Sequence, residues 1–153
     1  MKVKIAQIAD ALQMQIDESS AYLNTADGEV YIVSNEELSA AEEGEPPIED
    51  FPEWQQEAVK IAQQIINDDH YIALPTKYDI HEYAIMEEFC DSVADQKVSD
   101  ALQIAIQGKG AFRRFKDACH RFEISDQWYS YQTEALKEIA VSWCQENDLE
   151  YEV

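Results

Sequence analysis

Apolar residues recur mostly three and four positions apart along this chain of 153 residues, which predicts a protein built mainly from helices. One amphipathic helix is predicted from Ile5 to about Met14. Ser34 is placed to cap a short acidic helix over Asn35–Glu43, because a serine hydroxyl accepts a hydrogen bond from a free backbone N–H. Pro52 suits the first turn of the next helix, where its missing N–H is not needed.

Four further helices are predicted after the one that Pro52 opens. Asp79 is expected to cap the first of them and Gly108 to stop the second. Gly110 opens the third, and Ser125 caps the last. The apolar positions expected to face the core, helix by helix from Pro52, are Trp54, Ala58, Ile61, Ala62 and Ile65; Tyr83, Met86, Cys90 and Val93; Val98, Ala101, Leu102, Ala105 and Ile106; Phe112, Phe115 and Phe122; and Trp128, Ala135, Leu136, Ile139 and Trp143.

The dipeptide Asp27-Gly28 predicts a β-hairpin, since it favours a two-residue turn of type I′. That turn would pair Leu23 with Ile32, and Thr25 with Val30, on one face of the hairpin. The opposite face would carry Tyr22, Asn24, Tyr31 and Val33.

Two other short segments complete the pattern. Tyr71–Leu74 is either a strand or an extended connector, and Glu150–Val153 is expected to be extended. The predicted fold class is α+β, a mostly helical domain with an N-terminal antiparallel β-hairpin. Three parts are expected within one compact domain: residues 1–43 with the first helix, the hairpin and the acidic helix; an acidic, proline-containing linker over residues 44–51; and a helical region over residues 52–153.

The composition is that of a globular protein, with 46% hydrophobic and 28% charged residues. No apolar run approaches the ~18 residues of a transmembrane helix, and Met1–Ile5 lacks the apolar core of a signal peptide. We therefore expect a cytoplasmic protein with no membrane partner. Cys90, Cys119 and Cys144 show no C-x-x-C spacing and are expected to be free, buried thiols.

The charge is strongly acidic and uneven. Lys and Arg number 11 against 32 Asp and Glu, which gives a net charge of −21. No basic residue occurs between Lys4 and Lys60, and the stretch Glu36–Glu57 carries nine carboxylates. Such a region attracts a basic partner, or it simply solvates a loop and a helix face. The residues of the predicted partner surface are Glu42, Glu43, Glu45, Glu49 and Asp50.

One short segment is basic instead. Five of the 11 basic residues lie between Lys109 and Arg121, where glycines flank Lys109 at the start of a predicted helix. Unpaired N–H groups and a partial positive charge at a helix N-terminus favour an anion. The candidate binding residues are Gly108, Lys109, Gly110, Arg113, Arg114, Lys116 and Arg121.

The basic segment has three interpretations. Arg113, Asp117 and Arg121 stand four residues apart, so they can form a structural salt-bridge ladder. The cations can instead contact a partner protein or nucleic acid, or they can bind a small phosphorylated ligand. The segment is not a Walker A loop, because G-x-x-x-x-G-K-[ST] is absent.

The sequence gives no support for catalysis. The three histidines are scattered, and no nucleophile, zinc-protease or dinucleotide motif occurs. Asp68-Asp69-His70 resembles a metal corner, but two carboxylates and one histidine do not specify a metal, and a solvated helix end is favoured. We therefore name no catalytic residue, metal ligand or cofactor, and the sequence favours a protein that is not an enzyme.

The run Gly108-Lys109-Gly110-Ala111-Phe112-Arg113-Arg114-Phe115-Lys116-Asp117 resembles the hallmark of a bacterial group known as uncharacterised protein family 0158. Supporting positions spread over most of the chain are the hairpin Leu23 to Val30, Leu74-Pro75, Tyr83, Met86, Phe89, Trp128-Tyr129 and Trp143. The resemblance implies a bacterial or phage-borne cytoplasmic protein. It implies no activity and no residue roles, because the family has no established activity. The acidic stretch Glu42 to Asp50 departs from the family pattern.

The leading functional hypothesis is a small, acidic, non-enzymatic protein-interaction module. Its two surfaces would be the acidic region and the basic segment from Gly108 to Arg121. One alternative is a nucleic-acid or phosphate-binding module that uses the basic helix start. Another is an acidic inhibitor, of the immunity or nucleic-acid-mimic type, that caps a basic enzyme.

Overall fold

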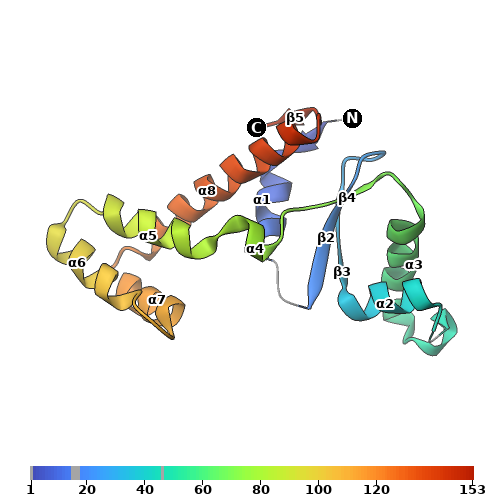
Figure 1. The fold of residues 1–153 in the computed structure, drawn as a ribbon, viewed down its shortest axis with the longest axis horizontal. Helices are drawn as coiled ribbons and strands as arrows, with labels where there is room; N and C mark the ends of the chain where they lie inside the picture. The colour runs from blue at the N-terminus through green and yellow to red at the C-terminus, as the bar shows by residue number, and fades with distance from the viewer. Residues whose placement is uncertain (1, 15–17, 46) are drawn as a thin grey trace. The chain divides into compact units, whose positions relative to one another are not determined.

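The computed structural model describes residues 2–14, 18–45 and 47–153 and shows a mostly helical α+β protein (Figure 1). Contacts within the chain divide it into two compact units. The sheet unit comprises residues 1–80 and 139–153, and the helical unit comprises residues 81–138. The predicted fold class is therefore confirmed.

The two ends of the chain meet in the sheet unit. Strand β1 (Val3–Lys4) pairs in parallel with β5 (Tyr151–Glu152), with Val3 opposite Tyr151 (Figure 1). Helix α1 (Ile5–Gln13) follows β1 directly and ends one residue before the predicted Met14. Its buried face carries Ile5, Ile8, Ala9, Ala11 and Leu12.

A three-stranded antiparallel sheet has the order β3-β2-β4. The central strand is β2 (Ser19–Asn24), and its neighbours are β3 (Val30–Ser34) and β4 (Tyr71–Ala73). The segment after residue 70 is thus a strand rather than a connector, and it adds a third strand to the predicted hairpin. Leu23 on the central strand is fully buried.

The predicted register of the hairpin is wrong by two residues. Leu23 pairs with Val30 rather than with Ile32, and Thr25 lies in the connecting loop. A shift of two positions keeps the side chains of the paired residues on their predicted faces, because side chains in a strand alternate with a period of two. The sequence therefore predicted correctly which of the paired residues share a face, but it did not predict which residues pair with each other.

The loop is longer than the sequence suggested because its side chains fold it locally. The Asn24 carboxamide accepts from the Ala26 N–H at 2.8 Å, and the Asp27 carboxylate accepts from the Glu29 N–H at 2.8 Å. Gly28 has φ 75°, and its N–H reaches the Asn24 carbonyl at 2.8 Å. These turns within the loop replace the two-residue turn.

Three helical elements follow β3. Helix α2 (Asn35–Glu43) begins with the predicted Ser34 cap, and Glu37 completes a capping box. Residues 44–51, expected as a linker, include the 3₁₀ helix η1 (Ile48–Asp50), while Pro46 lies outside the described residues. Helix α3 (Glu53–Asn67) packs on α2. A small cluster of Ala40, Ile48, Phe51 and Val59 joins the three elements.

The predicted core stripe of α3 is wrong in part. Ala62 is buried as predicted, but the side chain of Trp54 is 79% exposed, and Ala58, Ile61 and Ile65 are only half-buried. Val59 is the other fully buried residue of α3. The helix packs against α2 and β3 through a side rotated away from the most continuous apolar stripe. Amphipathicity located the helix, but its neighbours decide which side it buries.

The helix predicted after Asp79 is two helices. Helix α4 (Lys77–Ile80) ends before His81, whose φ of 55° lies in the left-handed region, and α5 (Glu82–Ser92) starts after it. Asp79 lies inside α4, and its carboxylate accepts from the Thr76 N–H at 2.9 Å. The buried residues of α5 are Ile85, Met86, Phe89 and Cys90, so Met86 and Cys90 are core residues as predicted, whereas Tyr83 is 40% exposed and Val93, just after the helix, is half-buried.

The helical unit continues with α6 (Gln96–Ala105), α7 (Ala111–Arg121) and the start of α8 (Ser125–Glu146), which extends into the sheet unit. All three helices were predicted. The buried residues of α6 are Ser99 and Leu102, with Ile106 just after it. The other apolar residues predicted to line its core face, Val98, Ala101 and Ala105, are half-buried.

Aromatic rings form the centre of the helical unit. The ring centres of Phe115 and Trp128 are 4.8 Å apart, and the Phe89 ring contacts both rings edge-on. Phe115 and Trp128 are core residues as predicted. Phe112 is not, since it is 40% exposed, and Phe122 is half-buried at the end of α7.

Helix α8 buries part of its predicted face. Trp128, Leu136 and Trp143 are buried as expected, whereas Ala135 and Ile139 are half-buried. The remaining buried positions of this helix are Gln132, Ala140 and Cys144. Cys90, Cys119 and Cys144 are all free and buried, which confirms their structural interpretation.

Candidate functional site

The connection between α6 and α7 has an unusual backbone. Gly108 and Gly110 both lie in the left-handed region, with φ of 72° and 76°. A side chain at Gly110 would also place its Cβ 3.1 Å from Nη1 of Arg114. The two glycines of the predicted hallmark are therefore required by the local fold.

Arg114 holds this connection together. Its guanidinium donates to the Ala105 carbonyl at 2.9 Å and also to the carbonyls of Gln107 and Lys109. These carbonyls lie at and just beyond the C-terminal end of α6, where a positive charge is favourable. Arg114 thus has a structural use that the sequence did not reveal.

The other predicted cations are differently placed. Lys109, Arg113 and Lys116 are exposed, and within the described residues they form no ion pair. The predicted ladder through Asp117 is not formed in that part of the chain, and the Arg121 guanidinium lies 4.8 Å from the centre of the Phe122 ring. We call Lys109, Arg113 and Lys116 the basic surface.

The predicted acidic residues all point to solvent. Glu42 and Glu43 end α2, Glu45 follows, and Glu49 and Asp50 lie on η1. All five are exposed, and none forms an ion pair with a described residue. We call these five residues the acidic face.

The acidic face stands on an ordered support. Ile48 packs against Ala40, Phe51 and Val59, so η1 is anchored to α2 and α3. The neighbouring Glu37 differs from the acidic face, because it is buried and accepts from the Ser34 N–H at 2.8 Å and the Gln55 amide at 3.5 Å. Glu37 therefore stabilises the start of α2.

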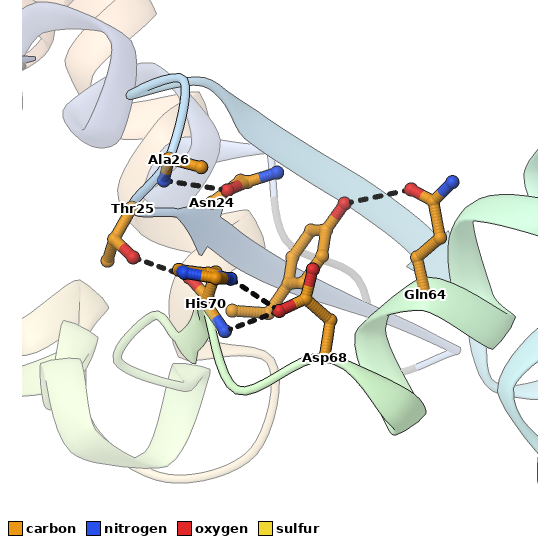
Figure 2. Close-up of polar contacts among 7 residues, drawn as sticks. Asn24, Thr25, Ala26, Gln64, Asp68 and His70 are labelled. Carbon is orange, nitrogen blue, oxygen red and sulfur yellow. Dashed lines mark hydrogen bonds and ion pairs between the residues drawn. The ribbon is translucent and has the colours of Figure 1, made fainter.

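A polar corner follows α3 (Figure 2). Oδ1 of Asp68 accepts from the backbone N–H of His70 at 2.9 Å and lies 2.6 Å from Nδ1 of the His70 ring. These two hydrogen bonds hold the pKa of Asp68 below its usual value, and the bond from the His70 backbone N–H contributes most. The Thr25 hydroxyl donates to the His70 carbonyl at 3.0 Å, which ties the corner to the hairpin loop.

Among the described residues, no group of three or more His, Cys, Asp or Glu side chains is arranged to hold a metal ion. In that same part of the chain, no helix combines the length and apolar character needed to cross a bilayer.

Two of the hollows lined by described residues were not foreseen from the sequence. One, of about 290 Å³, lies in the sheet unit between β2, the start of α2 and the segment after β4. The other, of about 500 Å³, is a shallow groove of the helical unit. Its lining residues are Phe89, Asp126, Gln127, Ser130, Tyr131 and Glu134. The sequence signal that could have pointed to the groove is Tyr131 between the carboxylates Asp126 and Glu134 on α8.

Comparisons with known proteins point in one direction. A family model described as "Uncharacterised protein family (UPF0158)" matches residues 1–153. The UPF0158 protein PA5073 of Pseudomonas aeruginosa is 31% identical over 67 residues, which are 43% of this chain and 44% of that protein. The match thus spans less than half of that relative. No solved structure matches the chain.

Proposed function

The chain belongs to UPF0158, an uncharacterised protein family, and we propose that it is a protein-interaction module whose acidic face binds a basic partner protein. The observation that carries the proposal is the acidic face itself. Its five carboxylates are exposed, they form no ion pair with a described residue, and they stand on packed elements.

Electrostatics supports this proposal. No Lys or Arg occurs between Lys4 and Lys60, so nothing in that part of the sequence neutralises the acidic face. A surface of one sign attracts a partner of the opposite sign over about 10 Å at moderate ionic strength and raises the rate of association. A basic enzyme held by an acidic inhibitor would be one partner of this kind.

Trp54 supplies the second element that an interface needs. It lies in the first turn of α3, four positions after Asp50, and its side chain is 79% exposed. Exposed tryptophans of this kind are frequent anchors of protein interfaces, where charged rims surround a buried aromatic residue. The acidic face would then guide the partner, and Trp54 would hold it.

A comparison of variants in affinity purification from a native lysate tests the proposal. The variant Glu42→Gln, Glu43→Gln, Glu45→Gln removes three charges from the acidic face. The control Glu87→Gln, Asp117→Asn, Glu146→Gln removes three exposed charges elsewhere. We expect to recover one stoichiometric partner protein, and its recovery should not change when the lysate is treated with nuclease. This partner should be recovered with the control variant and lost with the first variant. Equal recovery from both variants would refute the role of the acidic face.

The basic surface supports a second candidate function, the binding of nucleic acid or phosphate. Lys109, Arg113 and Lys116 form no ion pair with described residues although the chain has 32 carboxylates. The variant Arg113→Ala, Lys116→Ala should weaken binding of a fluorescent oligonucleotide and flatten its salt dependence. Lys60→Ala, Lys97→Ala is the matched control. No binding by the unaltered chain at low salt would exclude this function.

A further inference from the structure

The groove of the helical unit has an aromatic floor. Phe89 is 3% exposed, and its ring centre lies 5.4 Å from that of Tyr131 and 5.4 Å from that of Trp128. Phe89 is on α5 and Tyr131 is on α8, so the floor joins two helices of one packed unit. Such a floor is held in place before any ligand arrives.

Carboxylates surround this floor. Asp126 and Glu134 line the groove, and Glu88 accepts from the Tyr131 hydroxyl at 3.5 Å. The amine of Lys137 lies 3.7 Å from Oε1 of Glu134 and is the cation paired with this rim among the described residues. The rim of Glu88, Asp126 and Glu134 therefore keeps a negative charge.

We infer that this groove binds an arginine side chain from a basic segment of a partner protein. A guanidinium is planar, so it can stack on the Tyr131 ring while its N–H groups reach the carboxylate of Glu134, one helical turn after Tyr131, and Asp126 adds negative charge to the rim. The carboxylate rim disfavours a phosphate or another anion. The apolar floor gives this groove a means of holding a partner in addition to charge.

This inference goes beyond the proposed function, because the groove belongs to the helical unit and the acidic face to the sheet unit. It assigns a second surface for basic proteins and a specific side chain that the surface selects. Failure at one surface therefore leaves the other intact, and measurements resolved by residue distinguish the two.

The test is a titration of the full chain, followed by amide NMR, with the peptide acetyl-Gly-Arg-Leu-Arg-Gly-amide. A second peptide replaces both arginines by citrulline, which keeps the shape and removes the charge. We expect the arginine peptide to shift the amides of Gln127, Ser130 and Tyr131, and the citrulline peptide to leave them unchanged. Equal binding of both peptides would overturn the inference.

Variants of the floor and rim sharpen the test. Tyr131→Phe keeps the ring and should retain affinity, whereas Tyr131→Leu should lose about fivefold through the missing cation–π contact. Asp126→Asn with Glu134→Gln should lose about tenfold, and Glu87→Gln with Asp117→Asn, which also removes two exposed charges, should lose little.

Three results would overturn the assignment. The first is unchanged affinity in Tyr131→Leu, once its amide spectrum shows that the variant is folded. The second is a set of shifts confined to residues 42–50, which would place the arginine on the acidic face instead. The third is self-association of the free chain, measured by sedimentation and abolished in Tyr131→Leu, because the groove would then bind another copy.

Discussion

Arg114 illustrates how a single residue can look like a ligand contact and act as a support. The sequence placed it beside Arg113 in a basic segment, and both seemed equally suited to an anion. Nine positions separate Arg114 from Ala105, and only the left-handed turns at Gly108 and Gly110 bring that carbonyl within its reach. The pattern of side chains along the sequence does not show where the backbone turns back toward an earlier helix. The structural role of Arg114 could therefore not be predicted.

Replacement of Arg114 should therefore affect stability more than that of its neighbour. We expect Arg114→Lys to lower the free energy of unfolding by about 1–2 kcal/mol, because three separate guanidinium nitrogens each donate to one carbonyl and a lysine has only one nitrogen in their place. Arg113→Lys should change it by less than about 0.5 kcal/mol. Urea unfolding measures both, and equal effects would contradict the structural role.

The pKa of Asp68 offers a second test at the residue scale. Because bonds from His70 lower this pKa, their stabilising effect is complete above the pKa of the unfolded chain and disappears as pH falls through the folded value. His70→Ala removes the ring but keeps the backbone N–H, so the pKa of Asp68 should return only part of the way. An NMR titration measures it, with His120→Ala as the control that should have no effect.

At the scale of elements, local signals were reliable where the chain decides its own conformation. The Ser34 cap, the stops around Gly108 and the helical periods all depend on residues within one turn of each other. The hairpin register and the buried side of α3 depend instead on loop hydrogen bonds and on packing partners. Those elements were predicted incorrectly, and so was the helix expected after Asp79, which His81 divides into two.

The orientation of α3 can be tested by two substitutions. Val59→Ala should cost about 2 kcal/mol, because Val59 is fully buried against Ala40 and Phe51. Trp54→Ala should change stability by less than about 0.5 kcal/mol, because its ring is largely exposed. Thermal unfolding compares them. The reverse order would mean that the stripe read from the sequence is the buried one.

At the scale of the whole molecule, the net charge of −21 acts on stability as well as on binding. Repulsion among exposed carboxylates opposes folding, and salt screens it. We expect the midpoint of thermal unfolding to rise by a few degrees between low and moderate sodium chloride. The rise should be smaller in Glu42→Gln, Glu43→Gln, Glu45→Gln. A midpoint that falls with salt would contradict this view.

The sequence was informative about charge and class but could not locate a surface. It identified the five carboxylates of the acidic face as neighbours in the chain, because they lie within nine positions, and all five are exposed. It missed the groove, whose floor brings Phe89 next to Tyr131 from a distance of 42 residues. Contacts over such separations arise from packing of whole helices, which periodicity does not encode.

The three buried thiols can report when each unit of the folded chain opens. Burial raises the pKa of Cys90 and Cys119 to about 11 and also raises that of Cys144, so an alkylating reagent at neutral pH meets neither thiolate nor accessible sulfur in the folded chain. Cys90 and Cys119 belong to the helical unit and Cys144 to the sheet unit. Mass spectrometry of alkylated peptides would therefore time the opening of each unit separately, without any added label or new cysteine.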